Sequence, residues 1–271
     1  MSLFRRNTLY VGLEPDRASV VCLAGLRKPR VLADTSIPFA LDPRAPLLGP
    51  LIEALADPAF KASEIHLTLA DTLVRYFVTE AKLGVRSRAE LEETIAAHFE
   101  EQFGLPAGDW MISADLEPGA DAYLACAVPR ALVEALRGAC AGARLRVAGM
   151  TPYAVSEMNR WHRRLPGRDF WFAAAAPRSL TLGYRARTGW RGMRTHAGAA
   201  DVDTQLAALA QRDALLHGVA EVAPVRCSGL VGQPVHGTPS ATLLRLGAGL
   251  WPGRGEAWSR SYRLALSGAW P

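Results

Sequence analysis

Histidine and cysteine are the side chains that most often bind metals or act as nucleophiles, and in this chain both are scattered. The histidines show no H-E-x-x-H or other paired spacing, and the cysteines show no C-x-x-C spacing. Each cysteine lies in an apolar stretch, which is typical of a small buried side chain. We therefore expect no metal site, no catalytic residue and no disulfide framework among these residues: His66, His98, His162, His196, His217, His236, Cys22, Cys126, Cys140 and Cys227.

Three further segments have part of a known chemical pattern. Ser228 and Gly229 lack the flanking residues of a G-x-S-x-G nucleophile elbow. Residues 247–253 have glycines near the spacing of a dinucleotide loop, but the third is one residue too far along, and Pro252 prevents a regular helix there. Residues 160–164 mix Trp161 with arginines, as single-strand nucleic-acid binders do. Their place at a helix C-terminus favours a structural use of those cations.

A three-stranded meander is predicted at the start of the chain. Strands are expected at residues 9–13, 19–23 and 30–35, because apolar runs alternate with turn residues at 14–17 and 25–29. A helix follows around residues 47–55 and ends before Pro58. Short strands at 64–69 and 74–79 come next.

The clearest helix begins at Ser87. Ser87 and Glu90 have the spacing of a capping box, and Gly104 with Pro106 ends the helix. Strands are expected at 110–114, 122–128 and 144–148. Further helices are expected after Pro129 and Pro152.

A second meander starts near residue 169 and resembles the first. Residues 9–23 can be laid on 170–184 without gaps, which sets Arg17 against Arg178. A third strand at 190–195 and a helix with Val202 and Leu216 follow. The repeat predicts a duplicated α/β fold with a first lobe at residues 1–150 and a second at 151–271. An inserted subdomain is expected at about 60–128.

Charge differs between the two predicted lobes. The chain carries a net charge of +5, but residues 1–150 hold 16 Lys/Arg and 19 Asp/Glu, a net of −3, and residues 151–271 hold 15 Arg and 7 Asp/Glu, a net of +8. The basic half suits an acidic partner or an anionic surface, or simply a solvated face. No apolar run approaches the ~20 residues that cross a bilayer. The first residues also lack a signal-peptide core, so a cytoplasmic location is expected.

Within this layout the sequence resembles the type IV pilus assembly protein PilM and the cytoplasmic domain of the type II secretion protein GspL. The residues that carry the resemblance are 10–14, 70–78, 90–104 with Trp110, 125–130 and 152–161. The resemblance implies an actin-like ATPase architecture: two ribonuclease-H-like lobes with mixed five-stranded sheets flanked by helices. It also implies an assembly-platform component at the cytoplasmic face of the inner membrane. A PilM-like protein takes up the N-terminal peptide of a membrane partner, and a GspL-like domain docks the secretion motor ATPase.

Active members of that superfamily hold nucleotide with an acidic residue and glycines in their hairpin turns. In the first turn here, Glu14 stands where an aspartate is expected, and Pro15 removes a backbone donor. Asp16 places a carboxylate where a glycine should approach a phosphate, which costs on the order of 1 kcal/mol at a wet surface. The other residues of these turns are Arg17 and Ser19 in the first hairpin, Pro177, Arg178 and Ser179 in the second, and Ser228 and Gly229 in the third turn.

The second turn has neither an acidic residue nor a glycine, and the third has one glycine of an expected pair. We therefore expect no enzyme activity, no cofactor, and weak or absent nucleotide binding. The leading hypothesis is a non-catalytic scaffold that accepts an extended segment of its partner at strand 74–79, through Arg75, Tyr76 and Phe77. These three residues could equally just pack in the sheet. A nucleotide-gated ATPase switch and a nucleic-acid-binding module remain the alternative functions, although DNA binding is not expected.

Overall fold

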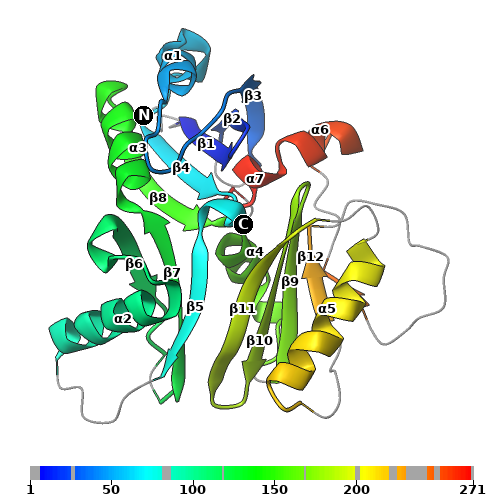
Figure 1. Ribbon diagram of the computed structural model, residues 1–271. Coiled ribbons are helices and arrows are strands. Elements are labelled where there is room, and N and C mark those ends of the chain that lie inside the picture. The colour runs from blue at the N-terminus through cyan, green and yellow to red at the C-terminus, as the bar shows by residue number, and fades with distance from the viewer. Residues whose placement is uncertain are drawn as a thin grey trace. The chain divides into compact units, whose positions relative to one another are not determined.

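The computed structural model describes residues 7–25, 28–80, 87–117, 119–167, 169–198, 202–219, 225–229, 243–246 and 251–269 (Figure 1). Contacts group the chain into two compact units. The first contains Met1–Leu73, Pro129–Arg160 and Gly249–Pro271, and the second contains Val74–Val128 and Trp161–Ala248. Each unit has its own sheet, and the two are described in turn.

The first unit is built on a five-stranded mixed sheet in the order β3-β2-β1-β4-β8. The first three strands pair antiparallel, as the predicted meander requires, while β4 and β8 extend the sheet in parallel from β1. Leu9, Val11 and Leu13 alternate along one face of β1 and are fully buried. The strands are β1 (Asn7–Glu14), β2 (Arg17–Ala24), β3 (Arg30–Pro38), β4 (Glu64–Leu69) and β8 (Arg146–Pro152).

Helices flank this sheet (Figure 1). The apolar stripe predicted after Pro129 is confirmed in α3, where Leu132, Val133, Leu136 and Cys140 are all buried. Short 3₁₀ turns at Pro58–Phe60 and Asp71–Leu73 precede and follow β4. The helices of this unit are α1 (Gly49–Ala56), α3 (Arg130–Gly142), α4 (Tyr153–Trp161), α6 (Glu256–Ser261) and α7 (Arg263–Leu266).

Helix α7 packs directly on β1. A Cβ atom added to Gly12 would lie 2.5 Å from the backbone nitrogen of Ala265 and 2.7 Å from the Cβ of Leu264. A glycine is therefore needed at this position because of the space and not because of its backbone angles. Trp251, at the start of this last segment, joins a core cluster with residues of β2 and α7.

In the second unit, the segment from β5 to β7 contributes three paired strands, and one helix covers them. Helix α2 begins where predicted, because the Ser87 hydroxyl accepts a hydrogen bond from the Glu90 amide at 3.1 Å. It ends at Gly104, whose φ of +63° is left-handed. The cluster between helix and sheet contains Phe77, Phe99 and Trp110. The elements are β5 (Arg75–Glu80), α2 (Arg88–Phe103), a 3₁₀ turn (Ala107–Asp109), β6 (Trp110–Ala114) and β7 (Ala122–Pro129).

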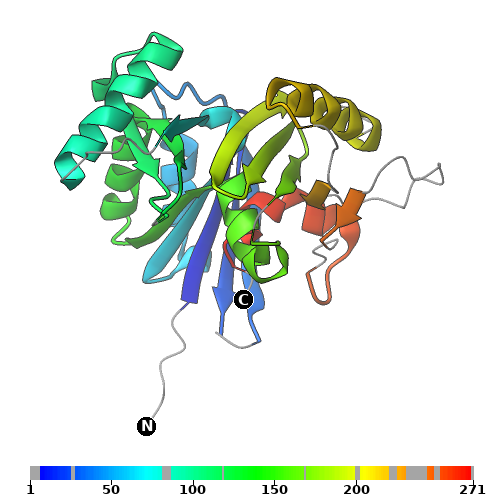
Figure 2. The same ribbon diagram turned by 90° about the horizontal axis from the view of Figure 1, so that it is seen from below.

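The second meander forms the rest of this unit. Strands β9, β10 and β11 pair antiparallel, and β12 and β13 continue the sheet in parallel from β9. Helix α5 covers one face, burying Leu206, Ala210 and Ala214 against the sheet, and Figure 2 shows it lying across these strands. The elements are a 3₁₀ turn (His162–Arg164), β9 (Phe170–Ala176), β10 (Ser179–Ala186), β11 (Gly189–Ala197), α5 (Val202–Leu216), β12 (Val225–Ser228) and β13 (Leu243–Arg245).

Two mixed sheets flanked by helices confirm the predicted fold class. The second sheet is longer than the expected five strands. Gly189 of β11 pairs with Ala122 of β7, and this contact adds β5, β6 and β7 to the sheet. Strand β4 belongs to the first sheet, and the inserted subdomain at about 60–128 stays a prediction. The division into lobes at residue 150 stays a prediction, since the units above are groupings by contact.

The two meanders do repeat, but the ungapped overlay was wrong by one residue. Glu14 pairs with Arg17 and Ala176 pairs with Ser179, so Pro15 corresponds to Pro177 and Asp16 to Arg178. The overlay failed because β9 is buried on both faces along almost its whole length, and a strand with two apolar faces carries no alternation that fixes the register.

Substitution of Gly12 tests the packing of α7 on β1. We expect G12A to lower the free energy of unfolding by about 1–3 kcal/mol, because the added methyl group meets backbone atoms that cannot rotate away. Urea denaturation followed by circular dichroism measures this. The matched control is G138A on the exposed side of α3, where nothing lies within 4 Å of the new Cβ. It should be neutral or stabilising by about 0.5–1 kcal/mol. Equal stability of the two variants would contradict the packing.

Candidate functional site

The first candidate turn joins β1 and β2 through only two residues, Pro15 and Asp16. Both of their carbonyl oxygens accept hydrogen bonds from the chain that leaves β3. The Leu41 amide donates to Pro15 at 2.8 Å, and the Phe39 amide donates to Asp16 at 3.1 Å. Pro15 has no N–H of its own. The turn is thus tight, its carbonyls are engaged, and the Asp16 side chain is exposed to solvent.

The second candidate turn, Pro177 and Arg178, repeats this arrangement. The Gly198 amide, at the end of β11, donates to the Arg178 carbonyl at 2.9 Å. A Cβ atom on Gly198 would lie 3.0 Å from the carbonyl carbon of Arg178, so a glycine allows the close approach. In both units a two-residue turn that starts with proline is hydrogen-bonded by the exit of the third strand.

The residues beside these turns are occupied with structural contacts. Ser19 is buried, and its hydroxyl donates to the Ser261 carbonyl at 3.1 Å. Glu14 is half-buried, Arg17 is exposed, and Ser179 is buried.

The third candidate turn follows β12. Ser228 is fully buried, and its hydroxyl accepts a hydrogen bond from the Trp161 indole nitrogen at 2.7 Å. Gly229 has a φ of +101°, which a side chain would strain. Leu230, which completes the predicted turn, lies outside the described residues, as do His236 and residues 247–250. Ser228 thus fixes the indole ring of Trp161 within the second unit, and no pattern in the sequence predicts this contact.

Of the three predicted partner-binding residues, only Arg75 is exposed. Phe77 is 2% exposed and lies in the cluster beneath α2, with Phe99 at a ring-centroid distance of 5.6 Å. Tyr76 is 7% exposed and belongs to the opposite face of β5. Strand β5 pairs with β7 along one edge, and within the described part of the chain no strand is hydrogen-bonded to its other edge. Strand β11 runs near β5 without pairing with it.

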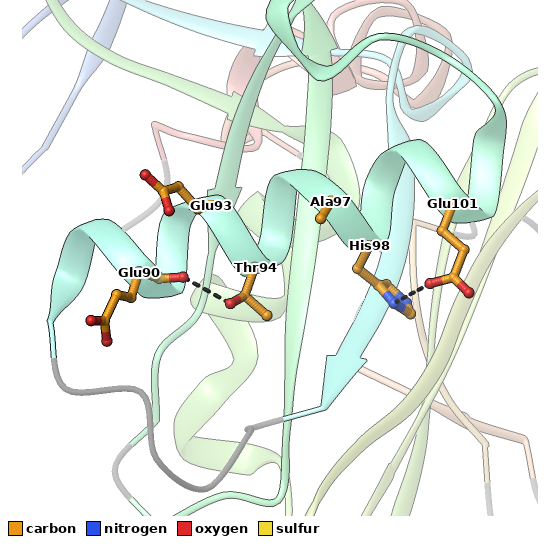
Figure 3. Close-up of a pocket in the computed structure, with 6 residues that line it drawn as sticks. All are labelled: Glu90, Glu93, Thr94, Ala97, His98 and Glu101. Carbon is orange, nitrogen blue, oxygen red and sulfur yellow. Dashed lines mark hydrogen bonds and ion pairs between the residues drawn. The ribbon is translucent and has the colours of Figure 1, made fainter.

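A shallow hollow lies on the outer side of α2, and all the residues that line it come from that helix (Figure 3). The Thr94 hydroxyl donates to the Glu90 carbonyl at 2.8 Å, and His98 Nδ1 is 4.0 Å from a carboxylate oxygen of Glu101. These contacts stay within one helix and leave a solvated acidic face. The lining residues are Glu90, Glu93, Thr94, Ala97, His98 and Glu101.

A buried charged cluster joins α4 to α7 in the first unit. The Arg263 side chain donates to the Tyr153 hydroxyl at 2.7 Å and to a carboxylate oxygen of Glu157 at 3.1 Å. Asp71 accepts from the Ala154 amide at 3.0 Å, at the first turn of α4. Tyr153, Glu157 and Asp71 are fully buried, and burial raises the pKa of the Tyr153 hydroxyl. Arg160 lies 3.6 Å from the other carboxylate oxygen of Glu157, and this oxygen has no hydrogen-bond partner within the described residues. The cluster is closed to solvent, and its contacts hold α7 against α4.

Metal-ligating residues do not gather anywhere in the described residues: no group of three or more His, Cys, Asp or Glu side chains there could hold an ion. The cysteines are free thiols. Three are buried as expected, and Cys126 is half-exposed instead. No helix in the described part of the chain is long and apolar enough to span a membrane.

The arrangement of both sheets is similar to that of several solved structures. One is the cytoplasmic domain of EpsL, an inner membrane component of the type II secretion system of Vibrio cholerae. It is 16% identical, with a TM-score of 0.59 over 96% of this chain and 95% of that one. Another is a PilM–PilN type IV pilus biogenesis complex, at 14% identity and a TM-score of 0.56, over 82% and 81%.

A third is a protein of unknown function with an actin-like ATPase fold from Bacteroides thetaiotaomicron. It is 11% identical, with a TM-score of 0.53 over 85% of this chain and 86% of that one. No family model and no curated protein sequence matches the chain. At these identities the likeness shows the fold: the chain has the actin-like ATPase fold that the resemblance implied.

Removal of the buried guanidinium tests the structural role of the charged cluster. We expect R263M to lower the free energy of unfolding by about 1–3 kcal/mol, because Tyr153 and Glu157 would lose a charged hydrogen-bond donor and Glu157 would keep only Arg160, 3.6 Å away, as its cation. Chemical denaturation gives this value. The control R137M, on the exposed side of α3, should change it by less than about 0.5 kcal/mol. If R263M is no worse than R137M, the cluster does not hold α7.

Proposed function

We propose that this chain is a non-catalytic assembly component of a type II secretion or type IV pilus platform. It would act at the cytoplasmic face of the inner membrane and bind a segment of a membrane partner there. The proposal is supported by the fold shared with the EpsL cytoplasmic domain and with the PilM–PilN complex. A motor ATPase would be a second partner on the same platform.

One observation supports binding without turnover: both hairpins are closed by two-residue turns that begin with proline. Phosphate binding in a turn needs several backbone N–H groups that converge on one point. Here Pro15 and Pro177 lack that donor. The carbonyls of Pro15, Asp16 and Arg178 are held by amides from the exits of β3 and β11. A triphosphate would meet oxygen atoms and the Asp16 carboxylate, which repel it.

The partner segment is proposed to add as a strand at the edge of β5 that does not pair with β7, where β11 lies nearby and would have to give way. An extended peptide pairs with such an edge through main-chain hydrogen bonds, and its alternate side chains then contact the flanking surface. Arg75, exposed at the start of β5, is the residue that would meet a carboxylate of the segment. Tyr76 and Phe77 would not contact the segment directly. Because they are buried, they would hold β5 in position for pairing.

Peptide binding tests the proposed partner site. A labelled peptide from the cytoplasmic N-terminus of the cognate membrane partner should bind the protein, and R75E should weaken binding about tenfold, or 1.4 kcal/mol. R88E, at the start of α2 and exposed, is the control that changes the same charge away from β5. Fluorescence anisotropy measures both. No binding of the wild-type protein at high micromolar concentration would rule out this partner site.

Calorimetry with ATP and magnesium tests the loss of nucleotide binding. We expect no heat of binding at ligand concentrations up to about 1 mM. Any dissociation constant would then exceed about 1 mM, so the binding free energy would be weaker than about 4.1 kcal/mol. GTP and ADP should behave in the same way. A dissociation constant in the micromolar range would instead support a nucleotide-gated switch, the alternative function, and would overturn the role assigned to the turns.

A further inference from the structure

Arginine and histidine side chains gather where β11 meets the end of α5 in the second unit. Arg191 and Arg194 are exposed on β11, and the Arg212 side chain is 50% exposed on α5. His196 on β11 and His217 just after α5 are half-buried beside them. This set of five residues is called the basic face below.

Local backbone features create this arrangement. The pairing of β10 with β11 shifts between Tyr184 and Arg185, so Arg191 has no partner and bulges from the ladder. The next residue is Gly192, and a Cβ atom there would lie 2.7 Å from Nε2 of His217. The His217 ring thus rests on the bare backbone of β11, with the Tyr184 ring 6.2 Å away.

Two described carboxylates act near the basic face: Asp169, whose charge acts on the Tyr184 hydroxyl in opposition to that of Arg191, and Asp213. Asp213 is 4% exposed and accepts both the Nε and the Nη2 hydrogen bonds of Arg212, at 3.1 and 3.0 Å. The Arg191 guanidinium donates to the Thr188 hydroxyl at 2.8 Å. Within the described residues no carboxylate forms an ion pair with Arg191 or Arg194. Two exposed guanidinium groups therefore remain to bind carboxylates from outside.

The pKa of each of the two histidines lies below its ordinary value. Burial lowers the pKa of His196; Arg212 and Arg194 lower it further, and Asp213 opposes them. Burial also lowers the pKa of His217, where Asp213 acts against Arg194 and Arg191. The Nε2 atom of His196 is buried and has no hydrogen-bond partner in the described part of the chain.

We propose that the basic face docks an acidic peptide segment of a protein partner. Paired carboxylates would meet Arg191 and Arg194 and would lie close enough to charge His196 and His217. A nucleic acid fits less well, because single-strand binding needs exposed rings on which bases stack. Tyr184 of β10, whose ring lies beside His217, is 9% exposed and stacked on Trp171 at 4.5 Å. This surface is separate from the β5 edge and does not rest on the function proposed above.

Docking is coupled to protons. In the free protein the pKa values of both histidines lie below their ordinary value, and a bound carboxylate raises them. The complex therefore holds more protons than its separated components at pH values near 7. Binding tightens as the pH falls through the range below about pH 7, where the histidines of the complex take up protons, and changes little above it.

The test uses a labelled peptide of alternating glutamate and serine as the probe, with a glutamine–serine peptide and a thymidine dodecamer for comparison. Fluorescence anisotropy at about 50 mM salt, where surface charges are weakly screened, gives the affinities. We expect R191E/R194E to weaken binding of the acidic peptide at least about tenfold. The matched control R44E/R137E changes the net charge equally at two exposed arginines of the first unit and should bind within about twofold of the wild type.

The pH arm compares about pH 6 with about pH 8, a range in which glutamate stays ionised. The wild type should bind the acidic peptide several-fold more tightly at the lower pH. H196Q/H217Q should lose that difference but should still bind the peptide through Arg191 and Arg194. Circular dichroism confirms that each variant is folded. Equal losses in the two double-arginine variants, equal binding of the glutamine–serine peptide, or tighter binding of the dodecamer through Arg191 and Arg194 would each overturn the proposal. A pH dependence unchanged by H196Q/H217Q would overturn its proton coupling.

Discussion

Hydrogen bonds from the end of a third strand to the turn between the first two recur in both halves of this chain. The amides of Phe39 and Leu41 reach the first turn, and the amide of Gly198 reaches the second. Each bond ties a meander closed and fixes where its third strand leaves the sheet. The same bonds engage the carbonyl oxygens of the two turns where the resemblance leads one to expect nucleotide contacts. The same hydrogen bonds hold each meander together and occupy its turn. We therefore propose a scaffold that keeps the actin-like architecture and binds partners instead of turning over nucleotide.

The first unit depends on a second constraint, the seating of its last segment. Helix α7 crosses β1 at Gly12, where no side chain fits, and Arg263 fastens it through Tyr153 and Glu157 of α4. Each of these contacts joins residues more than a hundred positions apart. The first sheet is therefore covered by α7 only when the last segment of the chain packs against it.

Much of the fold could be predicted because its signals are local. Ser87 and Gly104 mark the ends of α2 by their own chemistry, and Pro15 marks the first turn. The register between the two meanders could not be predicted. Because β9 is apolar on both faces, shifting the overlay by one residue leaves its apolar pattern unchanged. The matching prolines were the better guide, because a two-residue turn fixes the pairing of both strands that enter it.

The functional surfaces were harder to read. Alternation along β5 could not tell which of Arg75, Tyr76 and Phe77 is exposed, because Phe77 is buried on one face and Tyr76 on the other. Residues of the basic face come from β11 and from the end of α5, and only the bulge at Arg191 and the absence of a side chain at Gly192 bring them together. Nothing in the sequence marks either feature. The arginine-rich second half gave the sign of the charge but not its place.

The claim that the turns are closed to nucleotide can be tested at the hydrogen bonds themselves. Amide hydrogen exchange, resolved to single residues, would follow Phe39, Leu41 and Gly198 with and without ATP and magnesium. The account predicts slow exchange at all three amides and no change at residues 14–17 or 176–179 when nucleotide is added. Fast exchange at the three amides, or slower exchange in either turn on addition of ATP, would contradict it.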